Sequence, residues 1–528
     1  MFPFSNVGVT QLVAVETPAP PAPRPLPPIE QVAYPSIDTA AGVRLAATYQ
    51  IAVQGLPRGW EAAPWYTSLT VTPIANLCCP VKPAPLRTAH LSEDKKTLHL
   101  PRFLGLRAFG PPPNDERTYG RSFSPSAVLR PAPAPVTFSS ALKPVQVDAC
   151  TAALAQLRDV GGAMLVLPCG FGKTVCALWL AWTIGRQTLV LVHSDALAAQ
   201  WQDRVATFLP GCRVGRIQRD VADTDGCGVV VGMIQSVVKR EYAPELLRSF
   251  GTVIVDECHH VAAPMFMKSL EKLPARHVLG LSATPDRSDG LGVALEWFMG
   301  PIAFRAQRSH DRVDVEIVTF TGGPEREVLD RKGNPMCSTM ITSLAADGPR
   351  TVLVKELVSA QVVAGRNVIV LSDRREQLRT LHAMLAEDHP DTMITEVVGG
   401  TKPAARDHGF EHATVILSTY HYASEGIDIP RLDTLVLATP RGTIEQSVGR
   451  ILRPCAGKKR PRVIDVKDPF SLFEGMSWKR HRYYKSQSYN VRFVDDVGED
   501  VGEDGDEGDA GGRGGADAPR AESRKTSS

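Results

Sequence analysis

Several features that would assign this chain to a class directly are missing from its 528 residues. Lys and Arg number 59 against 57 Asp and Glu, and the net charge of +2 provides no global basic field that would indicate a nucleic-acid partner. Such a partner would have to bind a local groove. No apolar run reaches the ~18 residues of a membrane span, and residues 1–15 lack the basic start of a signal peptide. We therefore expect an intracellular protein that is neither secreted nor inserted in a membrane.

The cysteines of this chain do not form a redox or metal-binding motif. The ten cysteines include no C-x-x-C pair, and no Cys/His cluster has the spacing of zinc ligands. This favours reduced structural thiols. The hydrophobic content of 43% allows sizeable cores, and the length alone predicts about three or four domains.

Composition divides the chain into segments. Residues 1–33 form a Pro-rich head and residues 486–528 an acidic tail, and we expect both to be disordered because neither holds enough apolar groups to fold. A tail that competes with nucleic acid for a basic groove is the alternative. Residues 34–138 show strand-like alternation at Tyr66–Ile74 and Lys96–Leu100, which predicts a small accessory domain.

Apolar strand candidates alternate with amphipathic helix candidates over residues 139–305, and the pattern resumes over residues 351–485. It predicts two doubly wound α/β domains with mainly parallel sheets, joined by a connecting segment, residues 306–350. The strand candidates are Ala163–Leu167, Thr188–His193, Gly228–Gly232, Thr252–Asp256 and His277–Ser282, then Asn367–Ser372, Met393–Val398, Val415–Ser418, Thr434–Ala438 and Arg462–Asp465.

A glycine-rich stretch lies where the first strand candidate turns into a helix. It comprises Pro168, Cys169, Gly170, Phe171, Gly172, Lys173 and Thr174. Backbone N–H groups at such a turn surround a phosphate, and glycine lets the backbone approach it. Lys173 would reach the β/γ-phosphates and the Thr174 hydroxyl would bind Mg²⁺, although Leu167 stands where the strict pattern has glycine. We expect a site for ATP and Mg²⁺; a Gly-rich turn beside a surface lysine is the alternative.

Two carboxylates, Asp256 and Glu257, follow the strand candidate Thr252–Val255. Carboxylates at the end of a buried strand are costly unless a cation pairs with them, and Mg²⁺ on a nucleotide would do so. We assign Asp256 to the metal and Glu257 to the attacking water. A helix-capping acidic pair is the alternative.

The order of these motifs, followed by Leu281–Pro285 after another strand candidate, resembles the DExH-box helicases of superfamily 2. The resemblance implies two tandem RecA-like domains. In the second, Ser424–Pro430 resembles motif V, which implies nucleotide contacts for Gly426 and Asp428. Gln446–Arg453 resembles motif VI.

Motif VI carries the residues that would complete the reaction from the second domain. Its spacing places Gln446, Gly449, Arg450 and Arg453 on one face of a helix. Arg450 and Arg453 would supply charge to the γ-phosphate, a role worth roughly 10³–10⁵ in rate. A basic helix face exposed to water is the alternative.

The resemblance extends to further contacts. Gln146 looks like the reader of the adenine base. Residues that resemble the superfamily's nucleic-acid contacts are His193, Ser194, Gln235, Ser236 and Ser372, with Gln200 and Trp201 flanking the first two. Each is weak alone, because hydroxyl and amide residues after a strand often cap a helix.

Within the superfamily, residues 168–174 and 280–290 are most similar to XPB-type DNA helicases and their relatives in large DNA viruses. Residues 98–106 resemble the region where the motor begins in those viral relatives. The resemblance implies an ATP-dependent helicase that acts on DNA rather than RNA, with transcription or repair proteins as partners, in the cytoplasm or nucleus of a host cell or in a virion. The alternatives are the motor subunit of a nuclease or restriction complex, an RNA helicase, and a scaffold that binds nucleic acid without hydrolysing ATP.

Overall fold

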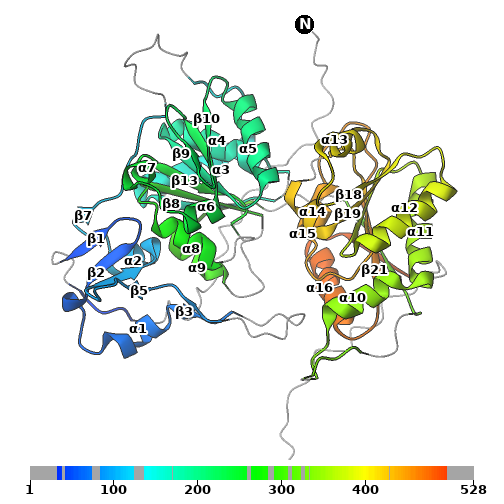
Figure 1. The fold of residues 1–528 in the computed structure, drawn as a ribbon, viewed down its shortest axis with the longest axis horizontal. Helices are drawn as coiled ribbons and strands as arrows, with labels where there is room; N and C mark the ends of the chain where they lie inside the picture. The colour runs from blue at the N-terminus through cyan, green and yellow to red at the C-terminus, as the bar shows by residue number, and fades with distance from the viewer. Residues whose placement is uncertain are drawn as a thin grey trace, which may run out of the picture.

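The structure, a computed structural model, describes residues 33–37, 42–73, 84–123, 136–168, 170–258, 263–283, 291–306, 312–322, 327–331, 333–426 and 429–495. It contains two α/β lobes side by side, with an N-terminal subdomain packed on the first (Figure 1). None of the described helices has the length and apolar character that crossing a membrane requires.

The N-terminal subdomain is built on a small sheet in the order β5-β6-β2-β1-β7. Its elements are β1 (Val43–Leu45), β2 (Tyr49–Ala52), α1 (Pro64–Thr67), β3 (Thr70–Val71), β4 (Leu86–Arg87), β5 (His90–Leu91), β6 (Thr97–Leu100), α2 (Arg102–Phe109) and β7 (Asn114–Asp115). The strand predicted at Lys96–Leu100 is confirmed as β6. Of the strand predicted at Tyr66–Ile74, only β3 is confirmed. The prediction is wrong for residues 66–69, because Pro64 starts a short helix that ends in a turn, and for residues 72–73, while Ile74 lies outside the described residues.

The first lobe contains a sheet in the order β11-β10-β12-β9-β13-β14-β8-β15, parallel apart from β11. Its elements are α3 (Pro144–Asp159), β8 (Gly162–Val166), α4 (Lys173–Ile184), β9 (Thr188–Val192), α5 (Asp195–Phe208), β10 (Val214–Gln218), β11 (Val221–Asp223), β12 (Val229–Met233), α6 (Ile234–Lys239), α7 (Pro244–Arg248), β13 (Thr252–Val255), α8 (Ala263–Glu271), β14 (His277–Ser282), α9 (Gly292–Met299) and β15 (Ile302–Arg305). One apolar core joins the sheet to α3, α4 and α5, and another joins the opposite face to α6, α8 and α9.

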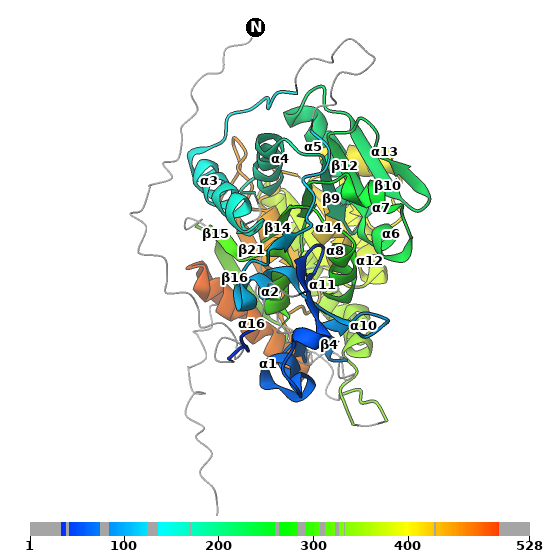
Figure 2. The same cartoon turned by 90° about the vertical axis from the view of Figure 1, so that its left-hand side faces the viewer.

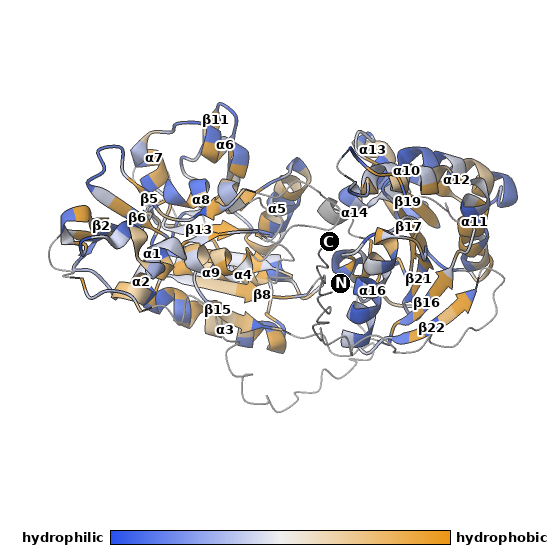
Figure 3. Cartoon of the chain, turned by 90° about the horizontal axis from the view of Figure 1, so that it is seen from below, coloured by the Kyte–Doolittle hydropathy of each residue, from blue (hydrophilic) through white to orange (hydrophobic). Residues whose placement is uncertain are grey.

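The second lobe contains a parallel sheet in the order β18-β19-β17-β20-β21-β16-β22. Its elements are β16 (Asp314–Thr319), α10 (Cys337–Ala346), α11 (Gly348–Val363), β17 (Val368–Ser372), α12 (Arg375–Asp388), β18 (Ile394–Val397), α13 (Pro403–His412), β19 (Val415–Thr419), α14 (Tyr420–Gly426), β20 (Thr434–Leu437), α15 (Glu445–Arg450), β21 (Arg462–Lys467), α16 (Leu472–Ser486) and β22 (Asn490–Asp495). Cores on both faces of the sheet bury it between helices, and apolar strands covered by polar helix faces are visible in Figure 3. The predicted α/β class is therefore confirmed for both lobes.

The bounds predicted for the second domain, residues 351–485, are too narrow at both ends. The connecting segment predicted for residues 306–350 contains β16, which pairs with β21 and belongs to the second sheet. The tail predicted for residues 486–528 begins with the end of α16 and with β22, which pairs with β16 as an edge strand. Three residues of β16 are buried and three are partly exposed, and β22 has a single buried residue, Val494. Both strands therefore lack the continuous apolar run that marks central parallel strands. The rest of the tail, and the head apart from residue 33, lie outside the described residues.

The N-terminal subdomain shares its apolar core with the first lobe. Phe103 on α2 packs so closely on Gly162 of β8 that a Cβ there would lie 2.2 Å from the phenyl ring. Arg102 is buried and donates hydrogen bonds to the carbonyls of Ala275 (2.7 Å), Leu273 (2.8 Å) and Ala47 (3.2 Å). The predicted accessory domain is therefore continuous with the first lobe, as Figure 2 shows from the side of the subdomain.

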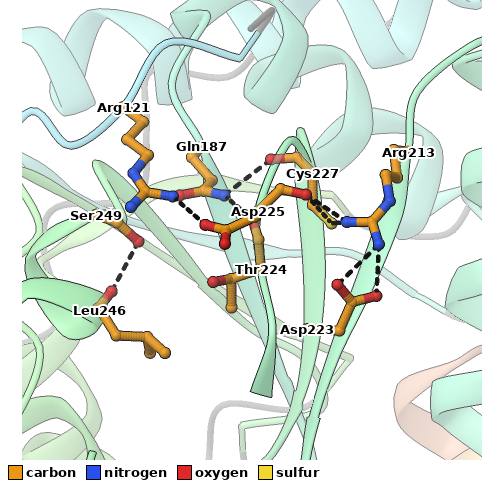
Figure 4. Close-up of polar contacts among 9 residues, drawn as sticks. All are labelled: Arg121, Gln187, Arg213, Asp223, Thr224, Asp225, Cys227, Leu246 and Ser249. Carbon is orange, nitrogen blue, oxygen red and sulfur yellow. Dashed lines mark hydrogen bonds and ion pairs between the residues drawn. The ribbon is translucent and has the colours of Figure 1, made fainter. Parts of the chain in front are cut away.

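Residues 117–123 continue this attachment along the amino ends of the lobe's strands. Backbone hydrogen bonds join Arg121 to Ser249 and Gln187 to Arg121. Figure 4 shows the Arg121 guanidinium paired with Asp225 at 2.8 Å, and the Gln187 amide donating to the carbonyls of Thr224 and Cys227. These contacts hold the turn before β12. Residues 117–123 therefore lie against the amino ends of several strands of the first lobe.

We expect Arg102→Ala to lower the free energy of unfolding by about 2–4 kcal/mol, because its buried hydrogen bonds to the first lobe are lost. Arg107→Ala, on the exposed face of the same helix, is the matched control and should change it by less than about 0.5 kcal/mol. Denaturant unfolding monitored by circular dichroism measures both. Equal effects of the two substitutions would contradict the role given to Arg102.

Candidate active site

Three of the predicted motifs meet at one edge of the first sheet. Strands β8, β14 and β13 are parallel neighbours, so their carboxyl ends lie together. Backbone hydrogen bonds join the segments beyond the strands: Leu167 N–H to Ser282 O at 2.9 Å, and Cys258 N–H to Leu281 O at 3.0 Å. The glycine-rich loop, the Asp-Glu pair and the end of β14 are therefore side by side.

The loop has the backbone that a phosphate site requires. Gly170 and Gly172 have φ angles of +85° and +96°, in the left-handed region that favours glycine. Lys173 is the first residue of α4, and Thr174 follows it. Leu167 is buried in the core. This explains why an apolar residue occupies the position of the first glycine; Cys169 lies outside the described residues.

Gln146 holds the loop from α3. Its Oε1 accepts the Lys143 N–H at 2.9 Å, and its Nε2 donates to the Phe171 carbonyl at 2.8 Å. A Cβ on Gly172 would lie only 2.4 Å from that Nε2. The structure thus gives Gln146 a role in supporting the loop, while its reading of an adenine base stays a prediction.

Lys173 and Glu257 form an ion pair at 2.7 Å between Nζ and Oε1, and their side chains are only 11% and 19% exposed. Glu257 has a φ of +45°, an uncommon conformation for a residue with a Cβ. Strain of this kind persists where the surrounding structure enforces it, often at functional sites. The lysine of the loop and the second carboxylate of the pair are therefore in direct contact.

Asp256 lies beside them, 6% exposed. Its Oδ2 accepts the Trp201 indole N–H at 2.7 Å and its Oδ1 accepts the Glu257 N–H at 2.9 Å. Burial, and then the negative charge of Glu257, raise the pKa of Asp256, while Lys173 opposes the shift. Burial likewise raises the pKa of the Cys258 thiol, so this cysteine is unreactive.

The residues present fit Mg²⁺. Hard oxygen ligands suit this ion, and Asp256 keeps lone pairs beyond its two hydrogen bonds. A cation would also relieve the repulsion between two neighbouring carboxylates in a buried position. Asp256 and the Thr174 hydroxyl would hold the ion together with the nucleotide's phosphates. Among the described residues, no group of three or more His, Cys, Asp or Glu is arranged for a metal held by protein alone.

The second lobe places the motif VI residues on and after α15, on the side facing the first lobe (Figure 1). Gln446, Gly449 and Arg450 are in the helix. Arg453 is not, and the prediction that it shares their helical face is wrong. The helix ends at Arg450, and Pro454 disfavours helical backbone at the residue before it. Gly426 ends α14, while Asp428 lies outside the described residues.

Buried ion pairs position the segment that precedes α15. Arg350 pairs with Asp468 at 2.7 Å and donates to the Ala438 carbonyl at 2.6 Å. Arg480 pairs with Asp465 at 2.8 Å and donates to the Arg441 carbonyl, also at 2.8 Å. These residues do not stand out in the sequence, because nothing in the local pattern pairs positions so far apart.

The predicted nucleic-acid contacts divide into two groups. Ser194 caps α5 by accepting the Leu197 N–H, and Gln235 donates to the His193 carbonyl at 2.8 Å, so these residues form one corner beside α5.

Ser236 and Ser372 are buried instead. The Ser236 hydroxyl accepts the Arg219 N–H at 2.9 Å, and the Ser372 hydroxyl donates to Gln377 at 2.7 Å. Ser372 is fully buried and Ser236 is 8% exposed, and both hydroxyls are engaged within the protein. The structure therefore gives both a role in the turn after a strand, which does not support the predicted direct contact.

Trp201 was predicted beside the nucleic-acid contacts, but its side chain is buried. The spacing of Leu197, Ala198, Trp201 and Val205 is the apolar periodicity of a helix, and these residues form the buried face of α5. That signal was available in the sequence. The bond from Trp201 to Asp256 was not, because it depends on how α5 sits against the sheet.

Comparisons with known proteins identify the family of the chain. Residues 139–287, which span the loop and the Asp-Glu pair, match the family model described as type III restriction enzyme, res subunit. A protein of Acanthamoeba polyphaga mimivirus described as "Putative ATP-dependent RNA helicase L396" is 32% identical over 365 residues, which cover 68% of this chain and 70% of the relative. The chain belongs to the helicase family.

A second viral relative and a solved structure are also similar to the chain. A protein of African swine fever virus described as "Putative ATP-dependent RNA helicase QP509L" is 30% identical over 374 residues, which cover 63% of this chain and 70% of the relative. A solved structure of "a putative HsdR subunit of a type I restriction enzyme from Vibrio vulnificus YJ016" matches with a TM-score of 0.50 and 18% identity, over 69% of this chain and 71% of that one. This last match supports the fold alone.

We expect Gly172→Ala to weaken nucleotide binding roughly 10- to 100-fold, because the new Cβ would displace the Gln146 amide that supports the loop. Gly211→Ala is the matched control: Gly211 also has a positive φ, +82°, but a Cβ there meets nothing within 4 Å. Titration with a fluorescent ATP analogue measures both. Similar losses in the two variants would show that backbone strain, and not the contact with Gln146, is responsible.

Proposed function

We propose that this helicase is an ATP-driven motor that moves along or unwinds DNA, hydrolysing ATP to ADP and phosphate. The observation that carries the proposal is the contact between Lys173 and Glu257 at 2.7 Å, next to the buried Asp256. A loop lysine, a metal carboxylate and a second carboxylate at one sheet edge are the parts that phosphoryl transfer to water requires.

In this proposal Lys173 exchanges its partner during the cycle. A nucleotide's phosphates attract the Lys173 ammonium, which releases the Glu257 carboxylate to accept a proton from water. Mg²⁺ with the nucleotide would neutralise charge at Asp256 and on the phosphates. Closure of the second lobe brings Arg450 and Arg453 to the γ-phosphate, and so couples hydrolysis to domain movement.

The choice of DNA rests on the resemblance of residues 168–174 and 280–290 to XPB-type DNA helicases. The relatives from mimivirus and African swine fever virus are described as RNA helicases, which favours RNA as the second candidate. A strand-displacement assay on matched DNA and RNA tailed duplexes decides between them. Faster unwinding of RNA would overturn the preference for DNA while leaving the motor in place.

A motor subunit of a restriction complex is a further candidate, favoured by the family model over residues 139–287. Such a subunit would need a nuclease. The described residues outside the motor contain no acidic cluster arranged for a metal, so cleavage would depend on a partner. Incubation of the full chain with plasmid, ATP and Mg²⁺ should produce no cuts. Cutting by the chain alone would show that it carries a nuclease and would overturn the dependence on a partner.

We expect Lys173→Ala and Glu257→Gln each to reduce nucleic-acid-stimulated ATP hydrolysis at least about 100-fold, because each removes a charge from the reacting centre. Binding of a single-stranded nucleic acid should be retained. Glu387→Gln, the same change on an exposed position of α12, should leave both unchanged. Phosphate release and fluorescence anisotropy measure the two properties. Loss of strand binding together with turnover would mean that these residues support the fold instead.

Strand binding should weaken with salt, with a slope of about −0.7 in log–log terms for each phosphate contacted on a single strand. The near-neutral net charge of +2 requires a local basic groove, so the slope counts the contacts in that groove. Anisotropy titrations at several salt concentrations measure it. A slope near zero, or hydrolysis that nucleic acid does not stimulate, would contradict the motor.

A further inference from the structure

Trp201 connects the interior of α5 to the catalytic edge of the first sheet. Its side chain is 1% exposed, and its indole Nε1 donates a hydrogen bond of 2.7 Å to Oδ2 of Asp256. An indole N–H can only donate, so Oδ2 of Asp256 is the acceptor in this bond. Hydrogen bonds to a charged partner are about twice as strong as those between neutral groups.

The orientation of the Asp256 carboxylate depends on such bonds. The last torsion of an aspartate side chain is broad, so the side chain does not fix the carboxylate plane by itself. The Glu257 N–H holds Oδ1 and the Trp201 indole holds Oδ2. Loss of the indole would free one of the two oxygens that the structure restrains.

The same helix reaches two other functional regions. Helix α5 begins at Asp195, directly after the Ser194 cap, which is one of the predicted nucleic-acid contacts. Gln235, another predicted contact, donates a hydrogen bond to the adjoining His193 carbonyl. Helix α5 also contacts α14 of the second lobe. A shift of α5 caused by a bound strand or by lobe closure would therefore move the indole that restrains Asp256.

We propose that Trp201 is a positioning residue that sets the Asp256 carboxylate for Mg²⁺ with the nucleotide, and that α5 transmits strand binding to the ATP site through it. The proposal deepens the function proposed above and rests on it. Outer partners of metal ligands act in this way in other sites, where their loss weakens metal affinity roughly 10- to 100-fold.

The chain contains a matched control. Trp297 on α9 is buried to the same extent, 1% exposed, in the same lobe, but its indole N–H has no hydrogen-bond partner among the described residues. Trp297→Phe and Trp201→Phe remove the same atoms from the same kind of surroundings. Only Trp201→Phe removes a bond to the site.

The first experiment measures ATP hydrolysis by the full chain against Mg²⁺ concentration. Trp201→Phe should raise the half-saturating Mg²⁺ concentration roughly 10- to 100-fold, and Trp297→Phe should leave it at the wild-type value. Trp201→His keeps a ring N–H donor and should restore the value part of the way. Equal values for Trp201→Phe and the wild type, or equal shifts in both Phe variants, would overturn the proposal.

The second measurement does not depend on turnover. Binding of a fluorescent ADP analogue in EDTA should be the same for Trp201→Phe and the wild type, because the loop itself is intact. With Mg²⁺ present, the variant should bind the analogue more weakly than the wild type does. Weaker binding in EDTA as well would mean that Trp201 supports the fold of the loop, and would overturn the proposal.

The third measurement tests transmission by comparing hydrolysis with and without a saturating single strand, at saturating Mg²⁺. Trp201→Phe should lose most of the stimulation at unchanged strand affinity, while Trp297→Phe retains it. Full stimulation in Trp201→Phe would overturn the role of α5. Absence of stimulation in the wild type would instead count against the motor function, and the Mg²⁺ dependence would still decide whether Trp201 positions Asp256.

Discussion

Parallel strands of one sheet end at the same edge, and the site of this helicase depends on that constraint. The loop after β8, the carboxylates after β13 and the residues after β14 are far apart in sequence but become neighbours because the three strands pair in register. Because these segments are neighbours, the Lys173 side chain contacts Glu257 directly. The order of strands in the sheet therefore accounts for the arrangement of the chemistry.

The second lobe solves its positioning problem with buried charge. Arg350 and Arg480 each pair with an aspartate and direct a remaining N–H at a carbonyl just ahead of α15. Buried ion pairs add little net stability, since desolvation offsets much of their attraction. Their contribution here is geometric, because they fix the backbone from which Arg450 projects. The first lobe uses the same approach at Asp256, with one indole and one amide.

Sequence patterns predicted the central strands well, because strands buried on both faces appear as continuous apolar runs. The prediction His277–Ser282 coincides with β14. Edge strands such as β22 escaped because partial exposure removes the run. The sequence predicted that Lys173 and Glu257 belong to one nucleotide site, but not that they contact each other. The bond from Trp201 was not predicted either, because it depends on the rotation of a helix, and the end of α15 was overlooked although Pro454 signals it.

The shared core of the N-terminal subdomain and first lobe has a consequence for how the polypeptide can be divided. Phe103 against Gly162, and Arg102 on the carbonyls near β14, hold the two parts together through side chains and not through the connection that follows residue 123. The two pieces left by a cut between residues 123 and 136 would remain associated as a non-covalent complex. In the proposed motor, the subdomain would therefore move together with the first lobe.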